Sequence, residues 1–288
     1  MLDLLRLMRP HQWVKNSFVL TGLLFGHAWH DPALVTKVII AFVAFCLTSS
    51  TIYIINDIVD IEQDKHHPTK RNRPLPSGKL TIPTAAIFAV LLGATAFTLA
   101  YFASQIVVLI LLIYAVMNIA YSLKLKHVVI LDVFIIATGF MLRILAGTLG
   151  LGIPPSQWLL LCGLMVTLFL GFSKRRAEII ALSDDKSAHR KVLEQYSAVL
   201  LDNMIVITGA GLIMSYSLYT MNPETIRIHG TANLIYTVPF VIYGVFRYIF
   251  LLHHQSSGGD PSKDLVRDPH MLIILLSWLI ATIVLIAR

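Results

Sequence analysis

Long stretches without charged residues constrain this chain more than any other feature of its sequence. A helix needs about 20 mostly apolar residues to cross the hydrocarbon core of a bilayer. Nine stretches of the 288 residues are candidates, the first of them short. They cover approximately residues 17–29, 33–58, 83–102, 105–123, 128–151, 158–172, 200–221, 232–252 and 271–287. Only 14% of the residues are charged, against about a quarter in soluble domains. We therefore predict an all-α, polytopic membrane protein with about nine transmembrane helices in a single domain, residues 1–288.

Lysine and arginine are distributed unequally between the segments that connect these stretches. Nine crossings would put 18 of the 23 basic residues on the side of the N-terminus, 3 on the other side, and Arg143 and Arg247 within crossings. Because basic loops stay in the cytoplasm, the N-terminus and the polar loops are predicted to face that side of the cell membrane. The same asymmetry accounts for the net charge of +7, so we expect no nucleic-acid partner.

The remaining composition gives little sign of other chemistry. Cys46 and Cys162 both lie in apolar stretches and are interpreted as packing residues, with no disulfide. The first residues, with Arg6, Arg9 and Lys15, are typical of an amphipathic entry segment rather than a cleavable signal peptide.

A group of carboxylates closes the second apolar stretch. If the helix continues, Asp57, Asp60 and Asp64 share one face, and three carboxylates so placed repel one another unless a cation lies among them. Oxygen ligands that leave room for phosphate suit Mg²⁺. Asn56, Asp57, Asp60 and Asp64 are therefore the candidate metal ligands. The alternative is a solvated acidic helix end, but ionisable groups beside a membrane span are usually functional.

A basic run follows these carboxylates. Lys70, Arg71 and Arg73 could bind the oxygens of a metal-bound diphosphate, because guanidinium groups match phosphate geometry. Cytoplasmic loops are commonly basic, so only the neighbouring carboxylates favour this interpretation. His66 and His67 lack partners at helical spacing and are interpreted as surface residues.

A second polar region follows the fourth apolar stretch. It contains Asn118, Tyr121, Ser122, Lys124, Lys126 and His127, and then Asp132 and Arg143. Asp132 and Arg143 are about three turns apart and share one helix face. An arginine inside an apolar stretch needs an anionic partner or a polar cavity, so a structural ion pair and a substrate contact both remain open for Arg143.

Two further polar regions come later in the chain. Lys174, Arg175 and Arg176 follow the sixth stretch, where a helix pair between Lys174 and Glu178 or anchoring to anionic lipid would be ordinary explanations. The turn-rich segment 258–269 contains three acids and two bases, and its composition indicates no function.

Together these motifs resemble the UbiA superfamily of intramembrane transferases, and within it the decaprenyl-phosphate phosphoribosyltransferase branch. The resemblance covers nearly the whole chain. It is carried by Asn56-Asp57-x-x-Asp60-x-x-x-Asp64, His67 to Arg71 with Arg73-Pro74, Tyr121-Ser122 with Leu125-Lys126-His127, Leu131-Asp132, Arg143 with Ala146-Gly147, and Phe172 to Glu178. Aromatic prenyltransferases of the superfamily have a second D-x-x-x-D motif. Here Asp132 is followed four residues later by Ile136, so the second region is richer in cations than in acids.

The resemblance implies a UbiA-like helix bundle and a glycosyltransferase of cell-wall biosynthesis. The implied reaction is a Mg²⁺-dependent transfer of a 5-phosphoribosyl group from phosphoribosyl diphosphate to a polyprenyl phosphate, with release of diphosphate. The expected catalytic residues are Asn56, Asp57, Asp60 and Lys126. The expected substrate-binding residues are Lys15, Lys70, Arg71, Arg73, Tyr121, Lys124, Lys126, Asp132, Arg143, Lys174 and Arg175.

Two alternatives remain. The first is transfer of a prenyl group from prenyl diphosphate to an aromatic or quinone precursor, which the incomplete second motif disfavours. The second is a transporter of anionic metabolites, which is disfavoured because the charges gather on one side instead of tracing a route across the bilayer. Release of diphosphate by the purified protein would distinguish a phosphoribosyltransferase or a prenyltransferase from a transporter.

Overall fold

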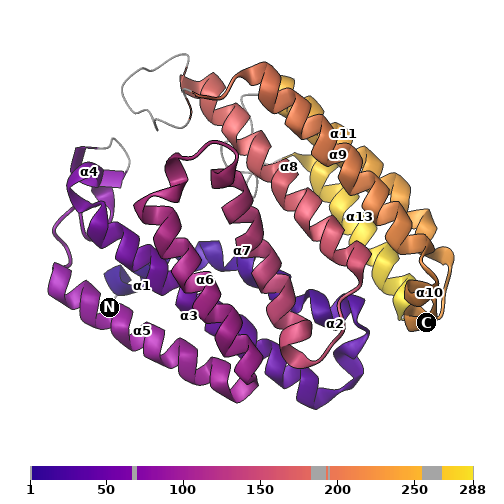
Figure 1. Ribbon diagram of the computed structural model, residues 1–288, viewed down its shortest axis with the longest axis horizontal. Coiled ribbons are helices and arrows are strands. Elements are labelled where there is room, and N and C mark those ends of the chain that lie inside the picture. Colours follow the sequence, from indigo (N-terminus) through magenta and orange to yellow (C-terminus); the bar gives the residue numbers. More distant parts are fainter. Residues whose placement is uncertain (1, 67–69, 183–192, 194, 255–267, 288) are drawn as a thin grey trace. The chain divides into compact units, whose positions relative to one another are not determined.

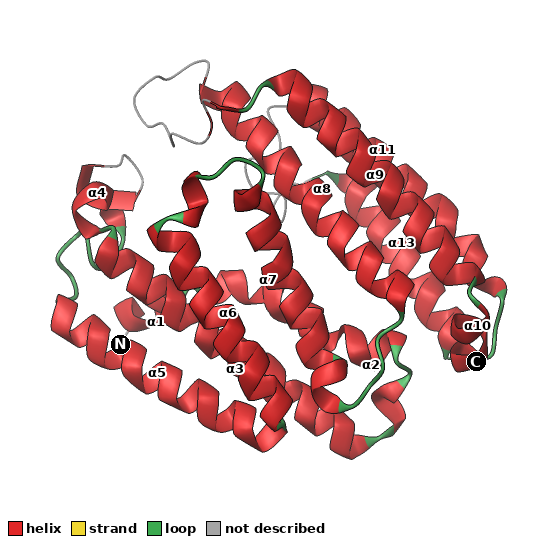
Figure 2. Cartoon of the chain, viewed as in Figure 1, coloured by secondary structure: helices red, strands yellow, loops and turns green. Residues whose placement is uncertain are grey.

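The computed structural model describes residues 2–66, 70–182, 193, 195–254 and 268–287. Within these residues every regular element is helical (Figures 1 and 2), which confirms the all-α prediction. The α-helices are α1 (Leu2–Met8), α2 (Thr21–Phe25), α3 (Pro32–Val59), α4 (Ile61–His66), α5 (Ile82–Ala103), α6 (Gln105–Leu123), α7 (Leu131–Gly147), α8 (Gln157–Leu182), α9 (Ala198–Met221), α10 (Pro223–His229), α11 (Val238–His254) and α13 (Pro269–Ile286). The 3-10 helices are η1 (Pro10–Leu20), η2 (Ala28–His30), η3 (Lys70–Asn72), η4 (Leu125–His127), η5 (Leu149–Leu151) and η7 (Asn233–Thr237).

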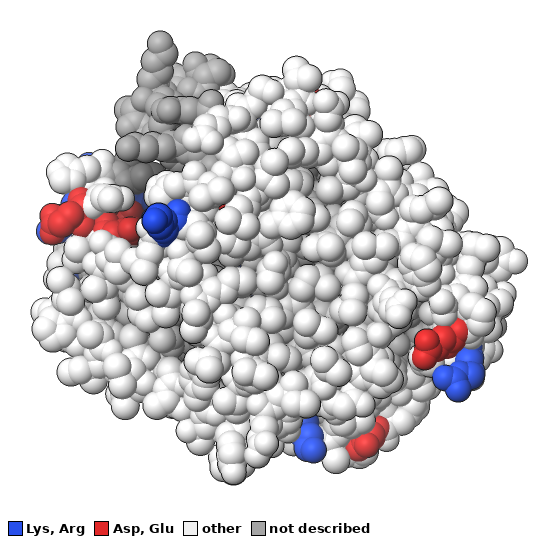
Figure 3. Space-filling model, viewed as in Figure 1, with Lys and Arg blue, Asp and Glu red and all other residues white. Residues whose placement is uncertain are grey.

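Eight helical segments within the described residues are long and apolar enough to cross a membrane, by length and composition. They are Pro32–Val59, Ile82–Ala103, Gln105–Leu123, Leu131–Leu151, Gln157–Ile180, Ala198–Met221, Asn233–His254 and Pro269–Ile286. Large apolar side chains on these segments face outward; Val90 and Val199, for example, are 70% and 71% exposed. The face shown in Figure 3 has only small groups of charged side chains at its edge, among the residues that are described. An outer surface of this kind suits lipid.

The first of the nine expected crossings, residues 17–29, is not one long α-helix, and the expected nine long helices become eight in the described chain. The segment consists of η1, α2 and η2. Gly22 and Gly26 lower its helix propensity, and His27 has a φ of 52°, in the left-handed region that ends a helix.

This broken N-terminal segment nevertheless runs alongside α3 in the opposite direction. Arg9 contacts Asp57 near the end of α3, and Trp13 Nε1 donates a hydrogen bond to Ser50 Oγ at 3.1 Å, almost two turns earlier. A 3-10 helix rises about 2.0 Å per residue and an α-helix about 1.5 Å, so η1 and α2 together extend about 30 Å. That is the thickness of a hydrocarbon core, and it is reached with few residues because η1 is stretched.

Two other boundaries differ from the expected stretches for local reasons. The fifth was expected from residue 128, but α7 begins at Leu131 because Ile130 has a φ of 67°. The left-handed conformation is strained for a β-branched residue and marks a turn, so the helix cannot include Ile130. The sixth was expected to end at residue 172, but α8 continues through Lys174 and Glu178. The charged motif after that stretch is therefore part of the helix itself.

The chain divides into two compact units, and α7 contributes residues to both. The first unit comprises Met1–Leu125 and Gly139–Pro155. In it, α3 packs on α5 through small side chains on one face of α5, spaced three, four or seven residues apart. They are Ala85, Ala89, Ala96, Ala100 and Ala103, all buried. Small residues at this spacing let two helix backbones approach closely, as in membrane helix pairs.

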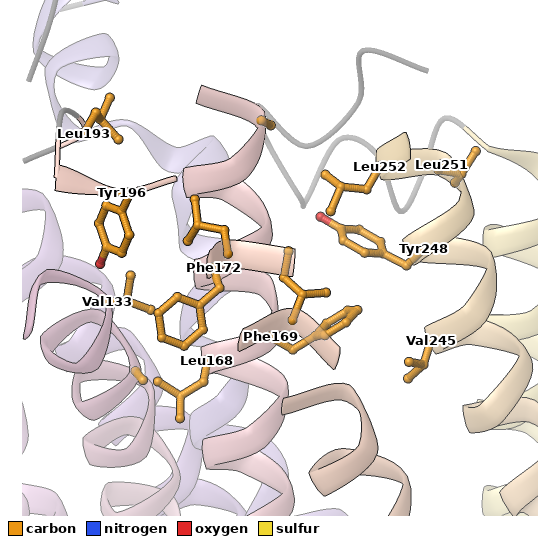
Figure 4. Packing of buried hydrophobic residues seen from close by; sticks show 14 of the residues in the cluster. Val133, Leu168, Phe169, Phe172, Leu193, Tyr196, Val245, Tyr248, Leu251 and Leu252 are labelled. Carbon is orange, nitrogen blue, oxygen red and sulfur yellow. The ribbon is translucent and has the colours of Figure 1, made fainter. Parts of the chain in front are cut away.

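The second unit comprises Lys126–Thr138 and Ser156–Arg288. Its core is a cluster of buried apolar side chains from α7, α8, α9, α11 and the start of α13. Figure 4 shows Leu168, Phe169 and Phe172 of α8 within this cluster, with Tyr248 of α11 facing Phe169. The rings of Phe169 and Tyr248 have centroids 5.4 Å apart, a common aromatic pairing. The prediction of one domain over residues 1–288 stays a prediction.

Candidate active site

The carboxylates at the end of α3 form a cluster with arginine in the first unit. Asp57 in the last turn of α3 and Asp64 in α4 are 3% and 2% exposed. One nitrogen of Arg73, Nη1, donates to Asp57 Oδ1 at 3.1 Å and to Asp64 Oδ2 at 2.7 Å. The helical path is almost continuous across the break, since the backbone N–H groups of Asp60 and Asp64 each donate to a carbonyl four residues earlier. The spacing read from the sequence thus does bring Asp57 and Asp64 together.

Two further cations complete this cluster, which we call the acid–arginine cluster (Arg9, Asp57, Asp64, Lys70 and Arg73). Arg9 Nη2 forms an ion pair with Asp57, and Lys70 Nζ lies 3.4 Å from Asp64 Oδ1. The side chains of Arg9, Arg73 and Lys70 are 20%, 30% and 40% exposed, so they connect the buried carboxylates to solvent. Within the described residues, three cations thus form ion pairs with these two carboxylates.

The other residues expected around this cluster are placed near it in sequence, but not in its ion pairs. Asn56 and Asp60 are partly buried, and Asp60 has no ion pair within the described part of the chain. Arg71 is exposed on η3. Lys15 is partly buried on η1. Residues 67–69, which belong to the resemblance, lie outside the described residues, so the outcome for His67 is open.

The expected Mg²⁺ can be tested against these residues. No three His, Cys, Asp or Glu side chains in the described ranges are arranged to hold a metal by themselves. Mg²⁺, however, commonly takes one or two carboxylates and fills its shell with water and phosphate oxygens. Asp57 and Asp64 converge on one cationic nitrogen of Arg73, so these two carboxylates already hold positive charge at one place. The residues fit the ion in that limited sense.

Arg143 lies in a separate buried network of the first unit. It is 5% exposed, and its Nε donates to Asn16 Oδ1 at 2.7 Å, its Nη1 to the carbonyl of Gly139 at 2.8 Å and its Nη2 to Tyr114 Oη at 2.7 Å. Its guanidinium lies over the rings of Tyr114 and Phe140 at 4.8 and 5.1 Å. Each of the three guanidinium nitrogens therefore has a partner among neutral groups of the protein, and none of these partners is a carboxylate or a ligand.

Asp132 and Arg175 pair with each other in the second unit. Arg175 Nε donates to Asp132 Oδ2 at 2.7 Å, and Tyr196 Oη donates to Asp132 Oδ1 at 2.8 Å. Arg175 Nη1 also donates to Glu178 at 2.5 Å. The side chains of Asp132 and Arg175 are 0% and 3% exposed. Burial, and then the hydrogen bond to Asp132, raise the pKa of Tyr196. The result is a closed network in which both carboxylate oxygens of Asp132 have partners.

The remaining expected contacts are nearer the surface. Lys126 on η4 and Tyr121 on α6 are partly buried, and Lys124, which ends α6, is exposed. Lys174 is 4.0 Å from Glu178 on α8, the ordinary helix pair considered above. The segment 258–269 lies almost wholly outside the described residues. Its Asp268 is described: it pairs with Arg247 at 2.7 Å, which lowers the pKa of Asp268.

The sequence interpretation missed several residues of these networks as parts of a site, among them Arg9, Asn16, Tyr114 and Tyr196. Arg9 had one usable signal, because the following Pro10 restricts its backbone and marks a helix break. Asn16 and Tyr196 had none, since an isolated asparagine or tyrosine reveals its partners only in three dimensions.

Comparison with known proteins identifies the class to which this arrangement belongs. The model of the UbiA prenyltransferase family matches residues 16–266. The chain therefore belongs to the UbiA prenyltransferase family and is an integral membrane transferase.

Two of its relatives are decaprenyl-phosphate phosphoribosyltransferases. The one from Corynebacterium glutamicum is 34% identical over 280 residues, which cover 96% of this chain and 84% of the relative. The one from Mycobacterium tuberculosis is 31% identical over 280 residues, covering 96% and 91%. A solved UbiA homologue from Archaeoglobus fulgidus, bound to GPP and Mg²⁺, matches with a TM-score of 0.74 at 16% identity, covering 99% of this chain and 100% of that one. At that identity the likeness concerns the fold. The family resemblance read from the sequence motifs is confirmed.

Proposed function

We propose that this transferase moves a 5-phosphoribosyl group from phosphoribosyl diphosphate to a polyprenyl phosphate. The observation that carries the proposal is the acid–arginine cluster, in which three cations, Arg9, Lys70 and Arg73, form ion pairs with the two carboxylates Asp57 and Asp64. A donor with a diphosphate and a 5-phosphate needs more cations than carboxylates. The activity named for the Corynebacterium and Mycobacterium relatives supports the same substrates.

The proposed reaction needs little acid–base chemistry. A phosphate oxygen of the lipid forms a bond to C1 of the ribose, and the bond from C1 to the diphosphate oxygen breaks, so that diphosphate leaves with the electron pair. A phosphate monoester is already ionised near neutral pH, and no side chain has to remove a proton from it. Orientation and neutralisation of charge then supply most of the acceleration.

The residues of the cluster divide these tasks. Asp57 and Asp64 would hold Mg²⁺, with Asn56 and Asp60 as the neighbouring oxygen donors proposed from the sequence. Mg²⁺, when bound, offsets the charge that develops on the leaving diphosphate. Arg73 forms hydrogen bonds to both carboxylates and is 30% exposed, so its free guanidinium edge is available to donor oxygens. Lys70 and Arg71 extend the same positive surface.

The acceptor contacts are proposed separately. Lys126 is partly buried on η4, and Lys174 is partly buried on α8. We propose them for the lipid phosphate. Asp132 and Arg175 would instead stabilise the packing of the second unit, because their charges already form a buried ion pair.

The cytoplasmic orientation of the cluster is also a proposal, motivated by the uneven distribution of basic residues. It can be tested with single cysteines introduced after replacement of the buried Cys46 and Cys162. Lys79→Cys should react only with a reagent on the cytoplasmic side, and Glu224→Cys, at a 61% exposed side chain, only from outside. Reaction of both from the same side would contradict the orientation.

The function itself is tested by product analysis. Purified protein is mixed with Mg²⁺, a polyprenyl phosphate and labelled phosphoribosyl diphosphate, and the lipid is examined by mass spectrometry. The proposal expects a lipid heavier by one phosphoribosyl group, with one diphosphate released per product. A prenylated aromatic acid formed from a prenyl diphosphate, with no product from the phosphoribosyl donor, would replace it with the prenyltransferase alternative.

A further inference from the structure

We propose that Arg143 is a positioning residue that fixes the N-terminal segment η1 and, through it, holds Arg9 against Asp57. Arg143 then serves the donor site although it does not belong to the acid–arginine cluster. In naming the donor this inference rests on the proposed function, but the structural link it describes concerns only residues of the first unit.

The hydrogen bonding of Arg143 leaves it poorly suited to capture a phosphate. Each of its three guanidinium nitrogens already donates, to a side-chain amide, a backbone carbonyl and a tyrosine hydroxyl. Aromatic rings lie close to the guanidinium plane, at 4.8 Å for Tyr114 and 5.1 Å for Phe140. Such cation–π contacts stabilise a buried guanidinium at its present position. The guanidinium of Arg143 thus has a structural role: it is a fork of three nitrogens that binds three groups of the protein.

Asn16 connects this fork to α3. It is 1% exposed, its Oδ1 accepts from Arg143, and its Nδ2 donates to Ser49 Oγ at 3.2 Å and to Cys46 Sγ at 3.4 Å. All hydrogen-bonding groups of the Asn16 amide are therefore directed at α7 or α3. The middle of η1 is fastened between these two helices.

The backbone of the N-terminal segment also lies directly on α7, one turn beyond Arg143. A Cβ atom added at Gly147 would lie 1.7 Å from the carbonyl oxygen of Val19, and one added at Gly22 would lie 1.9 Å from the carbonyl oxygen of Gly147. No side chain fits at either position. The sequence Arg143-x-x-Ala146-Gly147 therefore forms the contact surface for η1 and α2. The guanidinium of Arg143 binds Asn16 at one end of this surface, and the backbone of Gly147 lies against Val19 and Gly22 at the other.

The start of η1 reaches the candidate active site. Arg9 is its N-cap, with φ 53° and ψ 59°, a left-handed conformation that is uncommon for arginine and is retained only where the surroundings enforce it. From there its side chain passes over the ring of Tyr53 at 4.9 Å and pairs with Asp57. The 11 residues of η1 are far more than a 3-10 helix usually contains, so tertiary contacts must maintain it. Release of Asn16 would let η1 relax and move Arg9 from Asp57.

The test compares Arg143→Gln, Asn16→Ala and the double variant in steady-state kinetics. We expect each single change to raise KM for phosphoribosyl diphosphate about tenfold, with less than twofold change in KM for polyprenyl phosphate. The double variant should resemble the single variants, because both break one chain of contacts. Additive effects, with the increase in KM confined to the lipid substrate, would mean that Arg143 contacts the lipid phosphate directly and would overturn the proposal.

Two further variants separate positioning from charge and from general damage. Arg143→Lys keeps the charge but loses the fork, so it should resemble Arg143→Gln; wild-type donor KM in Arg143→Lys would argue against the fork. Arg247→Gln removes another arginine from an apolar segment, one that pairs with Asp268 in the second unit. It should lower the thermal stability without changing donor KM. Should Arg143→Gln fail to fold, Asn16→Ala has the same expected result by itself.

A binding measurement keeps this inference distinct from the proposed function. Inorganic diphosphate with Mg²⁺ probes the acid–arginine cluster without sugar or lipid. Its stabilisation of the folded protein should fall in Asn16→Ala and Arg143→Gln but not in Arg247→Gln, even if phosphoribosyl diphosphate proves not to be the donor. Equal stabilisation of all four proteins would reject the link between Arg143 and the cluster.

Discussion

Two groups of buried charge, one in each unit of this transferase, differ in how far they are open to solvent. In the first, Asp57 and Asp64 form ion pairs with three cations whose side chains are 20–40% exposed. In the second, Asp132 and Arg175 are almost inaccessible, and each finds its partners within the network. A charge cluster that remains open to solvent can accept a ligand, whereas a closed one mainly holds helices together. Charged motifs of similar appearance in the sequence thus have different roles.

The largest effect on transfer activity should follow loss of a carboxylate in the open cluster. Asp57→Asn removes the charge that Arg9 and Arg73 share, so metal and donor lose their anchoring point. We expect transfer activity to fall at least about a hundredfold, equivalent to about 2.7 kcal/mol in the activation barrier. Glu62→Gln is the matched control, an exposed carboxylate that pairs with the nearby Lys65, and it should stay within twofold of wild type. Comparable losses in both variants would remove the distinction between the carboxylates.

Removal of the metal should reproduce that loss. With a chelator present, transfer by the wild-type protein should fall to the level of Asp57→Asn, and added Mg²⁺ should restore it. The Asp57→Asn variant should respond far less to either treatment. Full activity of the wild type after chelation would show that Asp57 and Asp64 form ion pairs with the arginines but do not bind a metal.

A substitution in the closed network should lower the stability of the protein without changing its affinity for ligands. Asp132→Asn leaves Arg175 buried without its main counter-ion, and breaking a buried pair in this way costs about 3–5 kcal/mol. Thermal unfolding of the detergent-solubilised protein should therefore shift to lower temperature. Among molecules that remain folded, the affinity for diphosphate with Mg²⁺ should be unchanged. Weaker diphosphate binding with normal stability would place Asp132 in the donor site instead.

Arg73→Ala should have an intermediate effect in the open cluster. It removes hydrogen bonds to both carboxylates and a donor to ligand oxygens, and each charged hydrogen bond is worth about 1.5–3 kcal/mol. We expect the affinity for phosphoribosyl diphosphate to fall about tenfold to a hundredfold, measured by titration calorimetry. Arg227→Ala, at a surface arginine paired with Glu224, provides the comparison and should leave the affinity unchanged.

The smallest effect belongs to Tyr196→Phe in the closed network. The hydroxyl of Tyr196 accepts from the backbone N–H of Ile130 and donates to Asp132, so its loss should lower the free energy of unfolding by about 1 kcal/mol. Because burial raises the pKa of Tyr196, this contribution is complete below the ordinary pKa of about 10 and is lost as the pH rises further, through the folded-state pKa. The difference between variant and wild type should thus be constant from pH 7 to about 9. A difference that disappears within that range would contradict the assignment.

The sequence was sufficient for those features that local pattern determines. Apolar runs located eight of the crossings within a few residues, except where α8 carries on into its charged motif. The spacing of Asp57 and Asp64 was enough to place both on one side of the chain because the helical path is nearly continuous there. Family membership followed from several motifs in combination.

What the sequence did not reveal depends on long-range geometry. The first crossing was expected as a helix because hydropathy does not distinguish an α-helix from a stretched 3-10 segment. Arg143 could not be assigned because its partners, Asn16 and Tyr114, are 127 and 29 residues away in the chain. Asp132 was grouped with substrate contacts because its pairing with Arg175, 43 residues away, is a property of the folded helices.

The central claim, that the open cluster binds a metal-bound phosphoribosyl diphosphate, is tested most directly by calorimetry on the purified protein without acceptor lipid. Phosphoribosyl diphosphate is titrated with and without Mg²⁺ into wild type and Asp57→Asn, and geranyl diphosphate is titrated under the same conditions. The account predicts Mg²⁺-dependent binding of the phosphoribosyl donor to wild type, loss of that binding in Asp57→Asn, and weaker binding of geranyl diphosphate. Tight binding of geranyl diphosphate together with no binding of phosphoribosyl diphosphate would contradict it.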